Sequence, residues 1–463
     1  MNLRGLLKAS AAFGAVTVLY GMVGTSASFA ASLEEALQAA YDNNPTLLAQ
    51  RAGLRVTDET VSQAMSGWRP TVEASGSLGF LTEEDETSTT KTDDDRSFYN
   101  ASLTATQNLY AGGATTSGVD SAEASVLAAR ARLKAAEQSV LLDAATAYLD
   151  VLRDKAVLEL NQQNELRLKK QLEATRDRFE VGEVTRTDVA QAESRLSGAR
   201  ASTIQAVAAL EISKAAYVEV VGEEITGTVN APVLNLGLPT SRIEAIELAQ
   251  GMNPSIQARN YDYTSSLEDI KTAEASFRPN LDLVGSASYA NDVSTDDLES
   301  TDASVRLNLT VPIYQAGLVS SQVRSAKETA SQAKVLIEQE RRIIAELATT
   351  SWENLKSARA QIQAREDEVR ANFIAFEGVE QEAIVGSRTV LDVLDAEQDL
   401  LDAQVNLVRA KRDENVAQFT LLSATGGLTI ADLGLGGELY DAESYYNTVK
   451  NLWYGTGENS EAK

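Results

Sequence analysis

The 463-residue sequence contains no cysteine and no histidine. These absences exclude zinc fingers, iron–sulfur clusters, thiol nucleophiles and catalytic triads built on histidine. Basic side chains are also few, since 41 lysines and arginines stand against 67 acidic residues and give a formal net charge of -26. Such a chain lacks the basic surface that nucleic acid binding requires. Neither a GxxxxGK loop nor an HExxH motif is present, so the sequence predicts no enzyme, no cofactor and no metal site.

Proline and aromatic residues are scarce, with 7 prolines and 6% aromatics beside 43% apolar residues. All prolines lie outside 71–231 and 313–463. Because proline breaks the interior of a helix, both stretches can hold long helices. Within the first stretch, apolar residues that follow Gly113 have the 3,4 spacing of a coiled-coil seam: Val119, Ala122, Val126, Ala129, Leu133, Ala136 and Val140. Long helices are predicted from Gly113 to Val181 and from Gly317 to Val385.

The N-terminus has the pattern of a secretory signal peptide. Arg4 and Lys8 precede an apolar run from Ala11 to Val23, and small residues follow at Ser28 and Ala30. The run is too short for a membrane anchor, so cleavage ahead of residue 31 is the favoured interpretation. Beyond it no window of ~20 apolar residues occurs, and a membrane-embedded part would therefore have to be a β-barrel.

Short motifs of the first half recur in the second half, first at an offset of 209 and then at 204. They are Asn44-Pro45 and Asn253-Pro254, Trp68-Arg69-Pro70 and Phe277-Arg278-Pro279, and Val181-Gly182 and Val385-Gly386. A fixed offset over more than a hundred residues indicates one unit written twice. Each unit opens with a capping-box signature, at Ser32 and at Ser241, which predicts helices over 32–67 and 241–276.

Two segments in each half alternate apolar and polar residues. The apolar members of the first are Val72, Ala74, Gly76, Leu78 and Phe80. This period is typical of transmembrane strands, although a soluble hairpin with one wet face gives it too. The segments between the strands, 82–96 with seven acidic residues and 291–302 with five, are predicted to be solvated loops.

The predicted fold is mainly α, with long coiled-coil helical hairpins, four β-strands and an internal duplication. In the predicted organisation, a signal peptide over 1–30 is followed by a first repeat over 31–222, which has a β-hairpin at 71–110 and a helical hairpin at 114–222. An inter-repeat linker at 223–240 leads to a second repeat over 241–426, which has a β-hairpin at 280–313 and a helical hairpin at 318–426. The remaining residues, 427–463, form a tail. From the lengths of the helices, the linker and the start of the tail should form an equatorial belt before the tail becomes flexible. Four strands cannot close a barrel, whose smallest type needs about eight, so the barrel must be shared. Two copies give eight strands and three give twelve, and the arithmetic leaves both open.

Together with two turn sequences, these motifs make the chain resemble the TolC type of outer-membrane efflux protein. The turn sequences are VGEVTRTDVAQAE at 181–193 and VGSRTVLDVLDAE at 385–397. The resemblance covers nearly all of the chain after the signal peptide. It implies a homotrimer with a shared twelve-stranded barrel in outer-membrane lipid of a Gram-negative bacterium and a helical tunnel across the periplasm. It also implies two partners, a periplasmic adaptor and an inner-membrane pump of the RND, ABC or MFS type. The duct would conduct drugs or secreted proteins, and the sequence leaves these two open.

The resemblance also assigns roles to residues at the turns. Asp392 and Asp395, three apart on one helix face, would line the periplasmic entrance and favour cations; a merely solvated face is the alternative. Arg388 and Asp188, next to Thr187, would hold the gate closed. The family's tyrosine near the second turn is Ala383 here, which removes one tether. Residues expected to contact the adaptor, or otherwise only to shape the turns, are Val181, Gly182, Glu183, Arg186, Val385, Gly386 and Ser387.

A secreted coiled-coil stalk is the alternative function. It explains the heptads and the acidic charge, but it does not explain a β-hairpin after each Trp-Arg-Pro or Phe-Arg-Pro motif.

Overall fold

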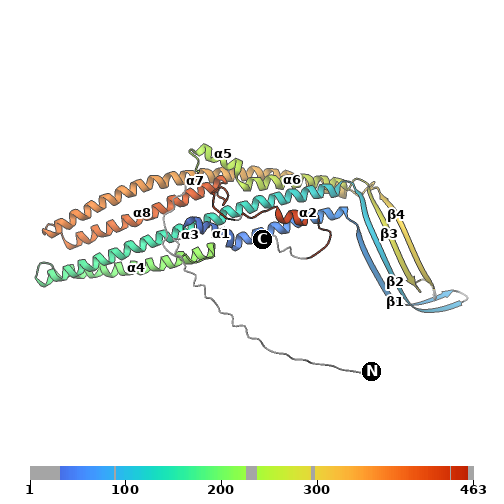
Figure 1. Ribbon diagram of the computed structural model, residues 1–463, viewed down its shortest axis with the longest axis horizontal. Coiled ribbons are helices and arrows are strands. Elements are labelled where there is room, and N and C mark those ends of the chain that lie inside the picture. Colours follow the sequence, from blue (N-terminus) through green and yellow to red (C-terminus); the bar gives the residue numbers. More distant parts are fainter. Residues whose placement is uncertain (1–31, 88–89, 226–236, 294–297, 438, 457–463) are drawn as a thin grey trace, which may run out of the picture.

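The computed structural model describes residues 32–87, 90–225, 237–293, 298–437 and 439–456. The predicted signal peptide and the middle of the predicted linker lie outside this part of the chain. The molecule is elongated, with two helical hairpins at one end and a four-stranded sheet at the other (Figure 1). The predicted fold class, mainly α with four strands, is confirmed. Among the described helices, none is both long enough and apolar enough to cross a membrane.

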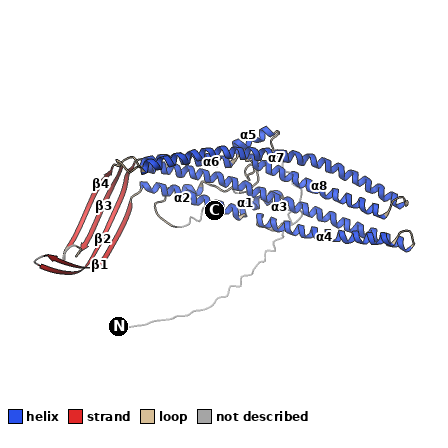
Figure 2. Cartoon of the chain, turned by 180° about the vertical axis from the view of Figure 1, so that it is seen from behind, coloured by secondary structure: helices blue, strands red, loops and turns tan. Residues whose placement is uncertain are grey.

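Two helices of 67 residues run along most of the body, α3 (Ala114–Glu180) and α7 (Leu318–Ile384). Each turns back into a helix of 36 residues, α4 (Arg186–Val221) or α8 (Val390–Thr425). Figure 2 shows the two hairpins side by side. Every second member of the predicted seam of α3 is buried: Val119, Val126, Leu133 and Val140. The 3,4 spacing therefore marks the face on which α3 packs.

The opening segment of each half is two helices in place of the single helix expected over 32–67 and 241–276. The pairs are α1 (Leu33–Asn43) with α2 (Pro45–Met65), which a short 3-10 helix η1 (Ser66–Trp68) extends, and α5 (Arg242–Met252) with α6 (Pro254–Ala275). The break falls at the repeated Asn-Pro motif. Proline has no N–H to donate and suits the first position of a helix, and the asparagine before it caps that helix.

The sheet is antiparallel with the strand order β1-β2-β3-β4. Its strands are β1 (Thr71–Thr87), β2 (Thr90–Ala111), β3 (Asn280–Asn291) and β4 (Glu299–Thr310). The first two strands pair from Thr71 with Thr106 up to Thr87 with Thr90. The acidic segment 82–96 is therefore largely strand and not the loop expected there. Backbone N–H and C=O groups form this ladder, so the pairing does not depend on the charge of the side chains.

The register brings the apolar residues of all four strands onto one face. Val72 pairs with Ala105, Ala105 with Gly285, and Gly285 with Val305. Directly opposed residues share a face of a sheet, and alternate residues along each strand do so too. Val72 is 67% exposed and Val305 is 77% exposed, so no described part of the chain covers this face. Nor do the outer edges of β1 and β4 have a partner strand in the described chain.

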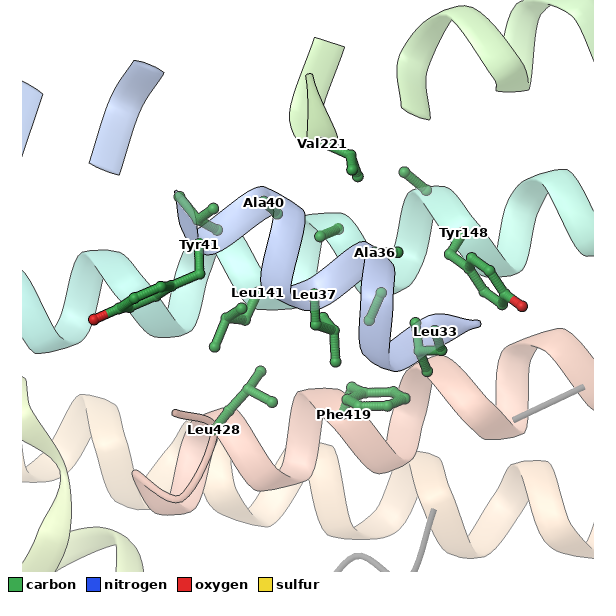
Figure 3. Close-up of a cluster of buried hydrophobic side chains, with 14 of the residues drawn as sticks. Leu33, Ala36, Leu37, Ala40, Tyr41, Leu141, Tyr148, Val221, Phe419 and Leu428 are labelled. Carbon is green, nitrogen blue, oxygen red and sulfur yellow. The ribbon is translucent and has the colours of Figure 1, made fainter. Parts of the chain in front are cut away.

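The largest buried cluster lies at mid-length, where helices of both halves meet (Figure 3). Leu37 of α1 and Leu141 of α3 are fully buried there, and Phe419 of α8 joins them. Leu428, just beyond α8, closes the cluster, and so the start of the tail is part of this core.

The described part of the tail continues past the mid-length core as far as residue 456, and the flexibility expected of the tail stays a prediction. Its short helix α9 (Ser444–Val449) lies on α2, where the hydroxyl of Tyr445 donates to Glu59 at 2.8 Å. Beyond α9, Arg69 donates to the carbonyl oxygen of Leu452, and its guanidinium lies over the ring of Trp453. Since Arg69 stands two residues before β1, the tail reaches from the core to the foot of the sheet.

Candidate functional site

The two helix tips, at the end of the molecule opposite the sheet, are built alike (Figure 1). Val181 ends α3 and Val385 ends α7, and both side chains are exposed, at 73% and 78%. Gly182 and Gly386 follow with φ of 83° and 80°, a left-handed conformation that glycine adopts without a steric penalty. The turns thus depend on the repeated Val-Gly pairs.

A capping box starts the return helix at each tip. Asp188 accepts hydrogen bonds from the backbone N–H and the hydroxyl of Thr185, both at 2.7 Å. Asp392 accepts the same pair from Thr389, at 2.9 and 2.8 Å. These hydrogen bonds from Thr389, with the nearby charge of Arg388, hold the pKa of Asp392 below its ordinary value. The Thr-x-x-Asp spacing carried this signal, yet the sequence reasoning did not use it for the tips.

Arg388 of the predicted gate pairs within its own hairpin. Its Nε donates to Glu382 at 2.8 Å, and this partner raises the pKa of the guanidinium further. Asp188 is bound to Thr185, so the two predicted gate residues do not meet inside one chain. Thr187 is exposed in the first turn of α4. A bridge from Arg388 to Asp188 of a neighbouring chain stays a prediction.

The predicted entrance carboxylates also have partners within the chain. Asp392 caps α8, as described, while Asp395 forms an ion pair with Arg195 of α4. This pair joins the two hairpins, because Arg195 belongs to the first and Asp395 to the second. Arg195 carried no signal in the sequence, since its partner lies 200 residues away.

The remaining tip residues are exposed around the turns. Glu183 pairs with Arg178 of its own hairpin at 3.1 Å, and Arg186 begins α4. Ser387 closes the second turn, because its N–H and its hydroxyl both donate to the carbonyl oxygen of Glu382, at 2.9 and 3.0 Å. For Ser387, turn geometry alone is therefore a sufficient role.

Behind the tips, α8 packs against the first hairpin. Leu394 of α8 is 1% exposed in a small cluster with Leu168 of α3 and Leu196 of α4. Glu397, one turn further along α8, is buried and accepts from Arg167 of α3 at 2.8 Å. Burial raises the pKa of Glu397 above its ordinary value. The sequence reasoning missed Glu397, which becomes notable only through a contact that joins the two repeats.

A sheet with one uncovered apolar face and a long helical body that ends in charged turns define a channel of the outer-membrane efflux class. The family model "Outer membrane efflux protein" matches residues 36–223 and 245–427, once in each repeat. The chain belongs to this family, which confirms the resemblance to TolC-type proteins and the internal duplication.

Individual relatives agree with this assignment. The chain is 34% identical to the outer membrane efflux protein BepC of Brucella suis over 97% of its own length and 96% of that protein. It is 29% identical to the outer membrane protein TolC of Vibrio cholerae, over 88% and 94% of the two chains. The structure of the Campylobacter jejuni CmeC outer membrane channel, 17% identical, shares the fold with a TM-score of 0.76 over 90% of this chain and 89% of that one.

Family membership settles the class of function. The protein is an outer-membrane efflux channel of a tripartite export or type I secretion system in a Gram-negative bacterium. It is a transport protein and not an enzyme. The alternative of a secreted stalk is thereby set aside.

Proposed function

We propose that the chain works as a homotrimer whose three sheets close one twelve-stranded barrel in outer-membrane lipid. The observation that carries this proposal is the pair of open edges, β1 and β4, beside a continuous exposed apolar face. Unpaired backbone groups cost several kcal/mol each in lipid, so an open sheet edge cannot lie there. Pairing β4 of one copy with β1 of the next removes both edges.

The helical hairpins of the three copies form the wall of a periplasmic tunnel. At ~1.5 Å per residue, α3 and α7 are each roughly 100 Å long. The tunnel passively conducts drugs or secreted proteins from an inner-membrane pump of the RND, ABC or MFS type, through a periplasmic adaptor. Both classes of substrate remain candidates.

The helix tips form the entrance and its gate. Three-fold symmetry turns Asp392 and Asp395 into rings of carboxylates that favour cations. Arg388 of one copy and Asp188 of a neighbour, beside Thr187, hold the tips closed. In support of this, all these residues lie at or next to the two turns.

The adaptor binds the exposed turns. The surface consists of Val181, Gly182, Glu183, Arg186, Val385, Gly386 and Ser387. The two valines supply an apolar contact, since each exposes more than two thirds of its surface with no partner in the described chain.

The chain's lack of cysteine makes the trimer directly testable. We would place one cysteine at Ser75 of β1 and a second at position 302, 304 or 306 of β4, and then oxidise outer membranes. A covalent trimer on denaturing gels is expected for the β4 position that faces Ser75 of the neighbour. The pair Ser75→Cys and Ser102→Cys, opposed within one chain, is the control and should give only monomers. A detergent-extracted species with the mass of one chain would contradict the proposal.

A further inference from the structure

The two hairpins are joined just behind the turns by two ion pairs, Arg167 with Glu397 and Arg195 with Asp395, and by apolar packing. We call this set the inter-hairpin seam. The apolar part is the cluster that holds Leu394 and Leu196, which are 1% and 5% exposed. Arg195 directly precedes Leu196, and Asp395 directly follows Leu394. The buried leucines therefore bring α4 and α8 together at the point where Arg195 and Asp395 form their ion pair.

The two ion pairs of the seam differ in their access to water. The carboxylate side chain of Glu397 is 5% exposed against Arg167, whereas Asp395 is 53% exposed and its partner Arg195 is 39% exposed. An exposed pair adds little to stability. Its carboxylate, however, remains open to solvent ions, and the neighbouring guanidinium lowers the negative charge that those ions meet.

We infer that Arg195 sets the charge of the channel entrance, by holding Asp395 as its counter-ion and tying the two hairpins together there. The inference rests on the proposed function, because it takes Asp392 and Asp395 as entrance residues. With Arg195 included, these three residues carry a net charge of -1 per chain, where the carboxylates alone would carry -2. Arg195 is thus a specificity-determining residue of the duct.

These net charges predict how tightly a multivalent cation should block the channel in each variant. The probe is hexaamminecobalt(III), a trivalent cation that exchanges no ligands, applied to single channels of the full-length trimer. Arg195→Gln makes the entrance more negative and should tighten block about ten-fold at moderate salt, because three symmetric charges act on one trivalent ion. Asp395→Asn should weaken block by a similar factor. The double variant restores the net charge of the wild type and should block as the wild type does.

Arg176→Gln is the matched control. Arg176 also lies near the tip, with a side chain that is 55% exposed, but it pairs with Glu193 inside the first hairpin and not with a proposed entrance residue. Its removal should leave block unchanged. If Arg195→Gln blocks as the wild type does and the double variant blocks as Asp395→Asn does, Arg195 has no influence on the entrance and the inference is wrong.

A second measurement separates this inference from the proposed function. Spin labels on cysteines at Ser194 of α4 and Asp399 of α8, both exposed, report the distance between the hairpins. Labelled chains are diluted into unlabelled trimers, so that only distances within one chain count. Arg195→Gln should broaden this distance distribution, and Arg176→Gln should not. If neither Asp392→Asn nor Asp395→Asn changes block, the proposed entrance fails, whereas an unchanged distance in Arg195→Gln overturns the tie between the hairpins.

Discussion

Asp58 is the side chain that conflicts most with its surroundings. It lies on α2 beneath the tail, it is 0% exposed, and neither of its carboxylate oxygens has a hydrogen-bond partner among the described residues. Burial raises its pKa to about 6, and Glu59 adds to the shift, while the charge of Arg130 opposes it. Around Asp58 the tail supplies two tyrosines, of which Tyr445 donates to Glu59. The protonated form of Asp58 therefore fits this site better than the charged form.

The raised pKa predicts that the tail is held more firmly in acid. Protonated Asp58 stabilises the packed tail fully below pH 3.8, the ordinary pKa of an aspartate. This stabilisation is lost as the pH rises through about 6, the raised pKa of Asp58. Backbone amides of α9 should therefore be better protected from hydrogen exchange at pH 5 than at pH 7, after correction for intrinsic rates. Asp58→Asn should remove most of this difference by giving strong protection at both values. Glu219→Gln, which alters an exposed carboxylate, should preserve the difference. Equal protection at both pH values in the wild type would show that Asp58 does not control the tail.

At the scale of elements, the repeated Asn-Pro motif holds each half of the body together. The side-chain oxygen of Asn253 accepts from the N–H of Ser255 at 2.9 Å and so caps α6. Its amide nitrogen donates to the carbonyl oxygen of Ala424, near the end of α8, at 3.1 Å. In the first half Asn44 does the same with Val220 at 2.7 Å. One side chain therefore starts a helix and anchors the end of another that comes from far along the chain.

Asn253→Ala removes both functions and should lower the free energy of unfolding by about 2 kcal/mol, roughly half from the cap and half from the unpaired carbonyl. Asn253→Ser keeps an oxygen for the cap but cannot reach Ala424, so its loss should be about half as large. Chemical unfolding of the detergent-extracted protein, followed by circular dichroism, measures both. Equal losses for the two variants would mean that the bond to Ala424 contributes nothing.

At the scale of the whole molecule, the features that repeat in the sequence were the ones that could be predicted. Proline-free stretches, the constant offset and the Val-Gly pairs predicted the long helical hairpins, and period-two alternation predicted the strands. The break before Pro45 was missed, because a capping asparagine and a proline read equally well as a solvated turn. The acidic composition of 82–96 favours a solvated loop, but it says little about pairing, because backbone groups and not side chains form the ladder between β1 and β2.

The predictions at the helix tips were less complete, for a physical reason. Local spacing identifies a cap such as Thr389 with Asp392, but it cannot show which side chains meet across packed helices. The partners of Asp395 and Glu397 come from the other repeat and follow from how α8 lies against α3 and α4. Even the capping box expected at Ser241 is only half formed, because Glu244 accepts from Thr240 instead.

In the assembled duct, Arg388 has two competing partners. Within the chain it pairs with Glu382, and the proposed gate pairs it with Asp188 of a neighbour. If the bridge to the neighbour keeps the duct closed, Arg388→Ser should raise single-channel conductance and sensitivity to vancomycin, and adding Asp188→Ala should change little more, since both remove one interaction. Glu382→Gln should then leave the duct closed, because it frees Arg388 for that bridge.

Thr185→Ala, which weakens the cap of α4 but keeps the charge of Asp188, controls for damage to the helix. Should Glu382→Gln open the duct as far as Arg388→Ser does, the closing contact lies within one hairpin; and wild-type conductance in Arg388→Ser would remove both residues from the gate.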